Sequence, residues 1–299
     1  MASIHKQLRG DIHEIAFVIG HFGPEVETLL KNIAARFNAK GSIYYQEEAL
    51  GTAHAIYCAK EAMSGEVVVA FADTLFDSTF TVNLKADATI WVKKIEDPSS
   101  FGVVEVSSNN TITRFVEKPK EFISDLAIIG IYHFKDGKAL RADIQHLIDH
   151  KIMKSNEYQL TDVLENMKNN GKTLMAGEVT QWLDFGNKNV FIESVTEVLK
   201  TEKPTSSTFT SENSIIIEPC FIGRNVSIKN SKIGPYVSIE ENTILEDCVI
   251  SNSIILKNSH LQGSNIRQSM IGSHVVIKDD KHMKELNIGD YNTLEYVHD

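Results

Sequence analysis

The last third of the chain carries a short repeat that restricts its fold. Twelve aliphatic residues recur five or six positions apart between Ile217 and Ile277. A helix or a meander of strands would give a different period. The spacing fits a β-solenoid, in which each short strand points one aliphatic side chain inward before the chain turns a corner. The twelve residues are Ile217, Ile222, Ile228, Ile233, Ile239, Ile244, Ile250, Ile255, Leu261, Ile266, Ile271 and Ile277.

The corners of this repeat often contain Gly or Asn, as in IGRNVS and IGPYVS, which suits tight bends. With roughly three strands per coil, the repeat predicts about four coils. An irregular all-β domain is the alternative interpretation. Because solenoids often serve oligomerisation, we expect a homo-oligomer, but the repeat alone indicates no activity.

The first 200 residues instead alternate strand and helix patterns, which is typical of an α/β domain. A strand at 12–20 is followed by Pro24, which suits a first helical turn, and by apolar residues on one helical face up to Phe37. We expect further strands at 67–72, 89–93, 126–134 and 173–179, helices at 52–63, 138–150, 161–170 and 188–200, and a hairpin at 101–119.

A segment rich in Pro, Ser and Thr separates the two halves, and it has no apolar period. We therefore expect an α/β domain at 1–200, a linker at 201–213 and the solenoid at 214–299.

Composition limits the cellular compartment and the kinds of ligand that we expect for this chain. No apolar stretch approaches the roughly 18–20 residues of a membrane span, and MASIHKQLRG lacks the apolar core of a secretory signal. Cys58, Cys220 and Cys248 have no metal-like spacing and are typical of reduced thiols, so we expect a cytoplasmic protein. The net charge of −10 argues against nucleic acid as a partner, so a phosphate ligand must be met by local Lys residues, backbone N–H groups or a metal ion.

Two carboxylates follow apolar strands. Asp73 ends the run EVVVAFAD and would by itself be a turn former or a helix cap. Asp184 in QWLDFG stands in a similar place, before a Gly and a helix. Ligands of open α/β sheets bind at the carboxyl ends of strands, so the two carboxylates could meet across a crevice. Two such oxygen ligands suit Mg together with phosphate oxygens and water.

Other residues could serve a phosphate-bearing substrate. Gly51 allows close approach of a ligand to the backbone, and Gln46 has the donor and acceptor needed to read the edge of a base. Glu117 can accept from sugar hydroxyls, Lys118 can neutralise a phosphate, and Gly102 is a second point of close approach. Each also has a structural alternative. Gly51 could be a helix-entry glycine, Glu117 and Lys118 a solvated charged pair beside a proline, and Gly102 a strand-entry bend.

Seven segments stand in the order seen in sugar nucleotidyltransferases, and as an ordered set they are highly specific. From about Ile12 to Leu199 the chain resembles the glucose-1-phosphate thymidylyltransferase group. The repeat is similar to the hexapeptide-repeat left-handed β-helix that is fused to the transferase domain in some relatives. The segments are QEEALGTAHAI, FADTLF, IWVKKIEDPSSFGVVEV, FVEKPKEF, SDLAIIGIYHF, NEYQLTD and WLDFG.

The resemblance implies an α/β fold: a Rossmann-like nucleotidyltransferase domain, with a mixed sheet and helices on both faces, followed by a left-handed β-helix. It also implies a reaction. An oxygen of a sugar 1-phosphate, with glucose 1-phosphate favoured, attacks the α-phosphorus of a nucleoside triphosphate, with dTTP or UTP favoured, and releases pyrophosphate. Catalysis of this kind is mainly positioning and charge neutralisation.

The same resemblance assigns roles to residues. Asp73 and Asp184 would hold Mg, and with Lys118, which would bind the sugar phosphate, they would carry the catalysis. Gln46 would contact the base, and Gly51 would let the nucleoside lie against the backbone. Gly102, Glu117, Ile128 and Gly130 would line the sugar, and Glu157 would reach its hydroxyls. Where many thymidylyltransferases have Asn and Tyr, this chain has Asp125 and Leu126, which leaves the sugar open.

One family segment is absent from the sequence. Family members open with a strand and a Gly-rich loop, in outline GxGTRxxP, that cradles the triphosphate, and this sequence opens at the helix before the second strand of the family. The neighbours of that first strand would lack backbone partners. Three explanations stay open: the true start lies upstream, another segment or chain fills the gap, or the domain has lost catalysis.

Three other functions compete with the enzyme. The first is a catalytically degenerate paralogue that binds a sugar phosphate or nucleotide sugar and acts as a regulatory subunit. The second is a bifunctional enzyme whose β-helix transfers an acyl group from coenzyme A, with His260 or His274 as base. A pure scaffold is the third, and it does not explain why the charged residues above occur in family order.

Overall fold

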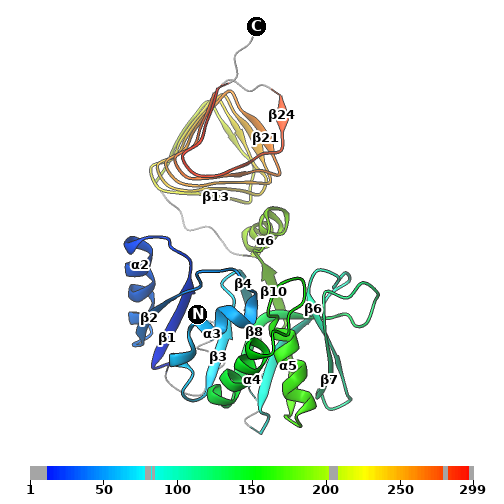
Figure 1. Cartoon of the computed structure of the whole chain (residues 1–299). Coiled ribbons are helices and arrows are strands. Elements are labelled where there is room, and N and C mark those ends of the chain that lie inside the picture. Colours follow the sequence, from blue (N-terminus) through cyan, green and yellow to red (C-terminus); the bar gives the residue numbers. More distant parts are fainter. Residues whose placement is uncertain (1–11, 78–81, 83–84, 202–207, 279–281, 296–299) are drawn as a thin grey trace. The chain divides into compact units, whose positions relative to one another are not determined.

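The structure of the chain, a computed structural model, describes residues 12–77, 82, 85–201, 208–278 and 282–295 (Figure 1). The chain divides into two compact units, Met1–Leu183 and Asp184–Asp299. The first unit is an α/β domain and the second contains a left-handed β-helix, which confirms the predicted fold class. Helix α6 (Lys188–Thr201) falls within the second unit, whereas the sequence pattern grouped it with the first domain.

A mixed sheet of six strands forms the centre of the first unit. Strand β8 pairs with β5 along one edge and with β6 and β3 along the other, while β7 and β9 extend the sheet at its two ends. The β5–β9 pair is parallel and the other pairs are antiparallel. The strands are β3 (Val67–Ala70), β5 (Ala88–Lys94), β6 (Gly102–Val106), β7 (Ile112–Glu117), β8 (Leu126–Phe134) and β9 (Leu174–Glu178).

Side chains alternate between the two faces of β8. Ile128 and Tyr132 belong to the large core that helices α3, α4 and α5 complete. Ile129 and Ile131 belong to a smaller cluster on the other face, to which β4 contributes Phe76. Strands β4 and β10 pair with each other. The elements are α3 (Thr52–Cys58), α4 (Gly137–Asp149), α5 (Leu160–Asn169), β4 (Thr74–Asp77) and β10 (Gln181–Asp184).

Strands β1 (Glu14–Ile19) and β2 (Lys40–Tyr45) form a separate parallel pair, and helix α2 (Pro24–Ala35) packs against β2. Among the described residues, β1 pairs only with β2, and β3 pairs only with β8. This agrees with the expectation that strands in this part of the domain have one edge without a backbone partner.

Most predicted elements of the first domain lie within two residues of the observed ones. The exception is the helix predicted at 52–63, because α3 ends at Cys58 and a 3₁₀ turn, η1 (Lys60–Ala62), follows it. Strands β2, β4 and β10 were not predicted. Strands β4 and β10 have four residues each with polar residues at both ends, and β2 begins with Lys-Gly-Ser, so none of the three contains an apolar run long enough to indicate a strand.

The β-helix has about five turns rather than the four that the repeat predicted. The aliphatic spacing is interrupted in the end turns, where Ser211 aligns with Ile228 and Lys284 aligns with Ile266, although Ile288 and Leu294 of the last turn still pack against the core. Three parallel sheets form its walls, in the orders β11-β14-β17-β20-β23-β26, β12-β15-β18-β21-β24 and β13-β16-β19-β22-β25. Their strands are β11 (Thr210–Glu212), β12 (Ile215–Ile216), β13 (Cys220–Ile222), β14 (Ser227–Lys229), β15 (Lys232–Ile233), β16 (Val237–Ile239), β17 (Ile244–Glu246), β18 (Val249–Ser251), β19 (Ser253–Ile255), β20 (His260–Gln262), β21 (Asn265–Arg267), β22 (Met270–Ile271), β23 (Val276–Lys278), β24 (Met283–Lys284), β25 (Asn287–Ile288) and β26 (Thr293–Glu295).

Two of the twelve predicted inward positions are wrong by one residue. Ile244 is 40% exposed, and its neighbour Leu245 lies in the core instead. Likewise Ile216, rather than Ile217, packs against the core. Successive strand residues point to opposite faces, so a shift of one residue moves a side chain from core to solvent.

One corner of the β-helix is built from a column of stacked turn residues. Asn225, Asn242, Asn258, His274 and Tyr291 all have positive φ angles, between 58° and 60°. The Asn225 amide donates to Asn242 and the Asn242 amide to Asn258, each at 3.2 Å, and the Asn258 amide nitrogen lies 3.3 Å from Nε2 of His274. The His274 ring stacks on Tyr291 with 4.7 Å between centroids. Asn tolerates this left-handed backbone better than most residues do, and its side chain links one coil to the next.

The close contact between coils predicts the effect of one substitution. Gly234 has φ +103°, and a Cβ atom there would lie 1.9 Å from the carbonyl oxygen of Ile217. Because both the backbone angle and the space exclude a side chain, we expect Gly234→Ala to lower the free energy of unfolding by roughly 2–4 kcal/mol. Urea unfolding measures this. As a control, Gly289→Ala should change it by about 0.5 kcal/mol or less, since its Cβ would come no closer than 3.8 Å to Asn292. Equal losses in the two variants would contradict the expectation.

Candidate functional site

Three of the predicted sugar-lining residues meet at the start of helix α5. Gly102 and Glu117 are register partners in the β6–β7 hairpin. A Cβ atom on Gly102 would lie 3.0 Å from Oε2 of Glu117, 3.0 Å from Cγ2 of Thr161 and 3.2 Å from Cδ1 of Ile128. The Thr161 hydroxyl donates to Glu117 Oε2 at 2.9 Å. A side chain at position 102 would therefore crowd the carboxylate and its neighbours, which would have to shift by a few tenths of an ångström.

Thr161 was not among the residues selected from the sequence. It is only 6% exposed, and it lies in the first turn of α5 between the buried Leu160 and Val163. A polar residue among apolar helix positions is itself a signal, because buried hydroxyl groups need partners. Here the partner is the Glu117 carboxylate.

The turn that carries Asp73 is attached to β8 beside the predicted Gly130. The Phe71 N–H donates to the Gly130 carbonyl at 3.0 Å, and the Thr74 hydroxyl donates to the Ile129 carbonyl at 2.9 Å. Gly130 has φ +80°, and a Cβ there would lie 3.0 Å from the Phe71 ring. Asp73 itself is exposed in the turn between β3 and β4.

Gly51 packs against the segment that carries Glu157. Its φ is +101°, and a Cβ atom would lie 2.6 Å from the carbonyl oxygen of Tyr158 and 2.9 Å from Cβ of Glu157. The Tyr158 N–H donates to the Leu50 carbonyl at 2.8 Å. The amide nitrogen of Gln46 donates to the Gly51 carbonyl at 3.2 Å. Gln46, Gly51 and Glu157 thus belong to one local arrangement, and the space at the Cα of Gly51 is filled by protein.

Hydrogen bonds connect this arrangement to the start of α5. The Gln159 amide donates to Glu157 Oε2 at 2.6 Å, and the Thr52 hydroxyl lies 3.5 Å from Gln159 Oε1. The Leu160 N–H, the first of the helix, donates to the Thr52 hydroxyl at 3.0 Å. Thr161 follows Leu160 directly, so one helix start joins the predicted base-side residues to the predicted sugar-side residues.

Lys118 has an unusual backbone. Its φ is +42°, although it is neither Gly nor Asn and precedes a proline. Its N–H donates to the Phe101 carbonyl at 3.1 Å, which ties it to the residue before Gly102. A non-glycine residue in this region costs about 1–3 kcal/mol, and such strain is concentrated at functional sites. The Lys118 side chain is exposed.

A comparison with known proteins decides the family. The family model for nucleotidyl transferases matches residues 1–201 of this chain. The chain belongs to the nucleotidyl transferase family. This confirms the resemblance to sugar nucleotidyltransferases that the ordered segments indicated.

Individual relatives are distant. The glucose-1-phosphate thymidylyltransferase of Streptomyces griseus is 25% identical over 313 residues, which cover 95% of this chain and 86% of that protein. The bifunctional protein GlmU of Methanococcus maripaludis (strain DSM 14266) is 25% identical over 224 residues, 72% of this chain but only 52% of that protein. A crystal structure from Bacillus anthracis that contains sucrose has a TM-score of 0.53 and 23% identity, covering 64% of this chain and 77% of that one. At this identity it supports the fold alone.

Asp184 has a local structural role in this nucleotidyltransferase. Its Oδ1 accepts from the Gly186 N–H at 2.9 Å, and its carbonyl accepts from the Ser194 hydroxyl at 2.6 Å. These bonds shape the turn between β10 and α6, and the second carboxylate oxygen has no part in them. Within the part of the chain that the structure describes, no three His, Cys, Asp or Glu side chains are grouped as a metal site. That Asp73 and Asp184 together hold a metal stays a prediction.

The two histidines considered as acyl-transfer bases differ in their surroundings. His274 is part of the corner column described above, bonded to Asn258 and stacked on Tyr291. Nε2 of His260 lies 3.7 Å from a carboxylate oxygen of Glu246. None of the helices in the described ranges is long and apolar enough to cross a membrane.

Tyr132 of β8 gives a pH-dependent prediction at this site. Burial raises the pKa of its phenol far above the usual value, and the charge of Glu117 raises it further. The folded domain keeps this proton near pH 10, where an unfolded chain begins to lose it, so the folded state binds more protons. The contribution of neutral Tyr132 is fully present below about pH 10 and is lost as the pH rises toward the folded pKa.

We therefore expect the free energy of unfolding to fall more between about pH 8 and about pH 11 in the wild-type chain than in Tyr132→Phe. Urea unfolding at the two pH values measures the difference. Tyr291→Phe, which alters a 77% exposed phenol, should behave like the wild type. If Tyr132→Phe has the same pH dependence as the wild type, burial does not hold the proton.

Proposed function

We propose that this chain binds a sugar 1-phosphate and a nucleoside triphosphate for nucleotidyl transfer, with glucose 1-phosphate and either dTTP or UTP as the favoured pair. The observation that supports this most is the convergence of Gly102, Glu117 and Ile128 with Thr161 at the start of α5. A fixed carboxylate beside a glycine and an aliphatic wall is suited to a polyol. It can accept from hydroxyl groups while the apolar side chain covers a ring face.

The sugar and its phosphate would be held from β6, β7 and β8. Glu117 accepts from sugar hydroxyls, and the Thr161 hydroxyl orients its carboxylate. Ile128 and Gly130 line the ring. Lys118, next to Glu117 and exposed, neutralises the sugar phosphate. Glu157 reaches further hydroxyls, with its carboxylate oriented by the Gln159 amide.

The nucleotide would be held at Gln46 and Gly51. Because the Cα hydrogen of Gly51 that a side chain would replace faces the segment at Tyr158, the base lies against the other side of this backbone. Gln46 uses its amide nitrogen for the Gly51 carbonyl, so its carbonyl oxygen is the group that we assign to the base.

A divalent cation would be held by Asp73 and Asp184, and we favour Mg because both ligands are carboxylates. The hard carboxylate oxygens fit such an ion, and each residue keeps at least one oxygen outside the hydrogen bonds described above. When bound, the ion would neutralise charge on the phosphates.

The reaction would then be a matter of position and charge. Glu117, Thr161 and Lys118 hold the sugar 1-phosphate so that one of its phosphate oxygens attacks the α-phosphorus in line. A bond forms between that oxygen and the α-phosphorus, and the bond to the β-phosphate oxygen breaks, releasing pyrophosphate. Holding both partners in this geometry replaces a bimolecular encounter. We also expect a cytoplasmic homo-oligomer without nucleic-acid or membrane partners.

One observation favours a second candidate. In the described part of the first unit, β1 and β3 each have an edge without a strand partner, near the proposed nucleotide residues. A domain with this arrangement could bind a sugar phosphate or nucleotide sugar without turnover and act as a regulatory subunit.

Binding of glucose 1-phosphate tests the sugar site. Glu117→Gln keeps the side-chain shape but removes the charge that accepts from the hydroxyls. We expect it to weaken binding by roughly 10- to 100-fold, since hydrogen bonds to charged groups are the stronger ones. Isothermal calorimetry measures this. Glu121→Gln, at an exposed position of the following loop, should bind as the wild type does. Equal affinity in the wild type and Glu117→Gln would exclude Glu117 as a sugar ligand.

Pyrophosphate release separates the two candidates. The proposed transfer requires pyrophosphate release when dTTP or UTP, glucose 1-phosphate and Mg are supplied. Release that Asp184→Ala abolishes would support the enzyme and the role of Asp184 in it. Sugar-phosphate binding without turnover, unaffected by Asp184→Ala, would favour the regulatory subunit.

A further inference from the structure

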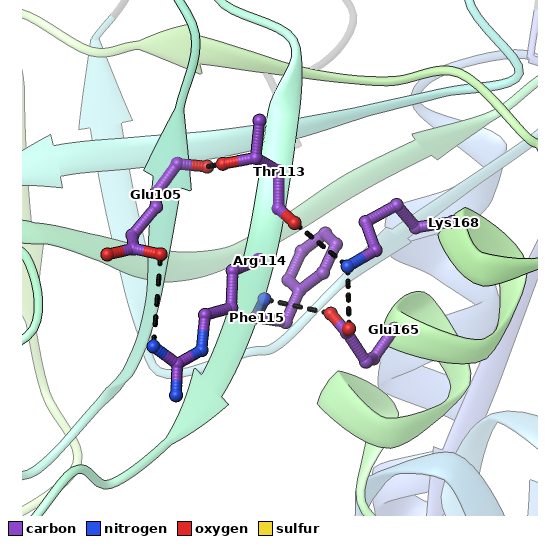
Figure 2. Close-up of polar contacts among 6 residues, drawn as sticks. All are labelled: Glu105, Thr113, Arg114, Phe115, Glu165 and Lys168. Carbon is purple, nitrogen blue, oxygen red and sulfur yellow. Dashed lines mark hydrogen bonds and ion pairs between the residues drawn. The ribbon is translucent and has the colours of Figure 1, made fainter.

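Helix α5 lies along the outer edge of strand β7 (Figures 1 and 2). Strand β7 ends the six-stranded sheet, so only β6 pairs with it through backbone hydrogen bonds. Figure 2 shows that two charged side chains of α5 contact the open edge. The Phe115 N–H donates to Glu165 Oε2 at 3.0 Å, and the Lys168 ammonium donates to the Thr113 carbonyl at 2.8 Å.

Glu165 and Lys168 thereby take the place of a neighbouring strand. An edge strand leaves alternate N–H and C=O groups unpaired, and here a carboxylate meets one N–H group while an ammonium meets one C=O group. The two side chains also form an ion pair with each other at 2.6 Å. Hydrogen bonds to charged groups are stronger than neutral ones, and this closed arrangement fixes both side chains.

The contacts set the register between helix and strand. Thr161, Glu165 and Lys168 lie on one face of α5, four and three residues apart. They oppose residues two apart on β7, namely Glu117, Phe115 and Thr113. One helical turn rises 5.4 Å and two strand residues span about 6.6 Å, so the two elements can match over this short distance. The same register brings Glu117 to Thr161.

We infer that Glu165 is a positioning residue for Glu117. By fixing β7 to α5 through the Phe115 N–H group, it holds the Glu117 carboxylate at the Thr161 hydroxyl and beside Gly102. The inference rests on the proposed function, because that function gives Glu117 its ligand. A residue that merely protected the edge of the sheet would change stability and leave ligand affinity as it was.

Three variants of the hairpin and helix test this with glucose 1-phosphate as the probe. Glu165→Ala removes the acceptor for the Phe115 N–H and should weaken binding by roughly tenfold. Glu165→Gln keeps an oxygen acceptor and should recover most of that loss. Glu105→Ala is the matched control, because Glu105 pairs with Arg114 at 3.9 Å on the same hairpin, away from α5 (Figure 2). It should bind as the wild type does. Calorimetry measures the affinities, and urea unfolding of each variant records stability separately.

A double-mutant cycle identifies the route of the effect. If Glu165 acts through Glu117, then adding Glu165→Ala to Glu117→Gln should cause little further loss of affinity, although both changes still add in stability. If the two losses of affinity add fully, Glu165 does not act through Glu117 and the inference is overturned.

The remaining outcomes separate this inference from the proposed function. If Glu117→Gln weakens binding but Glu165→Ala does not, the positioning role is overturned and the proposed function stands. If the wild type does not bind glucose 1-phosphate, or Glu117→Gln has no effect, the proposed sugar site is wrong and the role of Glu165 there fails with it. Should Glu165→Ala not fold, Lys168→Met removes the Thr113 bond and the ion pair with Glu165, and it leaves Glu165 as the acceptor for the Phe115 N–H. It should weaken binding by about threefold and should be silent in the Glu117→Gln background.

Discussion

Strand β8 is the element on which the candidate site depends. Its nine residues pair with three strands, and most of them are buried. A shift of β8 would break hydrogen bonds on both edges and expose apolar side chains on both faces, so its position is strongly determined. Ile128 and Gly130 belong to this strand, Gly102 is joined to it through β6, and the Asp73 turn is joined to it through Phe71. The site therefore has the rigidity of the core.

The sequence predicted the part of the site that is carried by strong local patterns. The hairpin of β6 and β7 and the strand β8 were predicted from their apolar runs and turn residues, but the register that places Gly102 opposite Glu117 was not, because it shifts between Glu105 and Val106. Thr161 was missed because a Thr in a first helical turn is ordinary, and only its burial among apolar positions distinguishes it. Glu165 could not be selected either, since an acid in the middle of a helix is typically solvated. Its partner is a backbone N–H group 50 positions away, which no local pattern reports.

In the β-helix the sequence predicted the spacing of the inward residues better than it predicted which residue of each strand points inward. Neighbouring aliphatic residues stand together at Ile215-Ile216-Ile217 and at Ile244-Leu245, and both Ile216 and Ile217, like both Ile244 and Leu245, fit a spacing of five or six. The choice is made in three dimensions, where the strands of adjacent coils pair in register and only one member of each pair lies over the column beneath it. The period gives the number of residues between corners, whereas the backbone at each corner determines which residue of the next strand points into the core.

Unusual backbone angles and tightly packed polar groups distinguish the candidate site from the rest of the fold. The β-helix contains many non-glycine residues at positive φ, but they recur from coil to coil at its corners, as at Asn225, Asn242 and Asn258, where the turn requires them. In the hairpin region the departures do not repeat. Lys118 has positive φ before a proline, its neighbour Glu117 carries a half-buried carboxylate, and its hydrogen-bond partner lies next to Gly102, where a Cβ atom would be tightly packed. Stability alone gives no reason for such features to gather in one place, whereas ligand binding does.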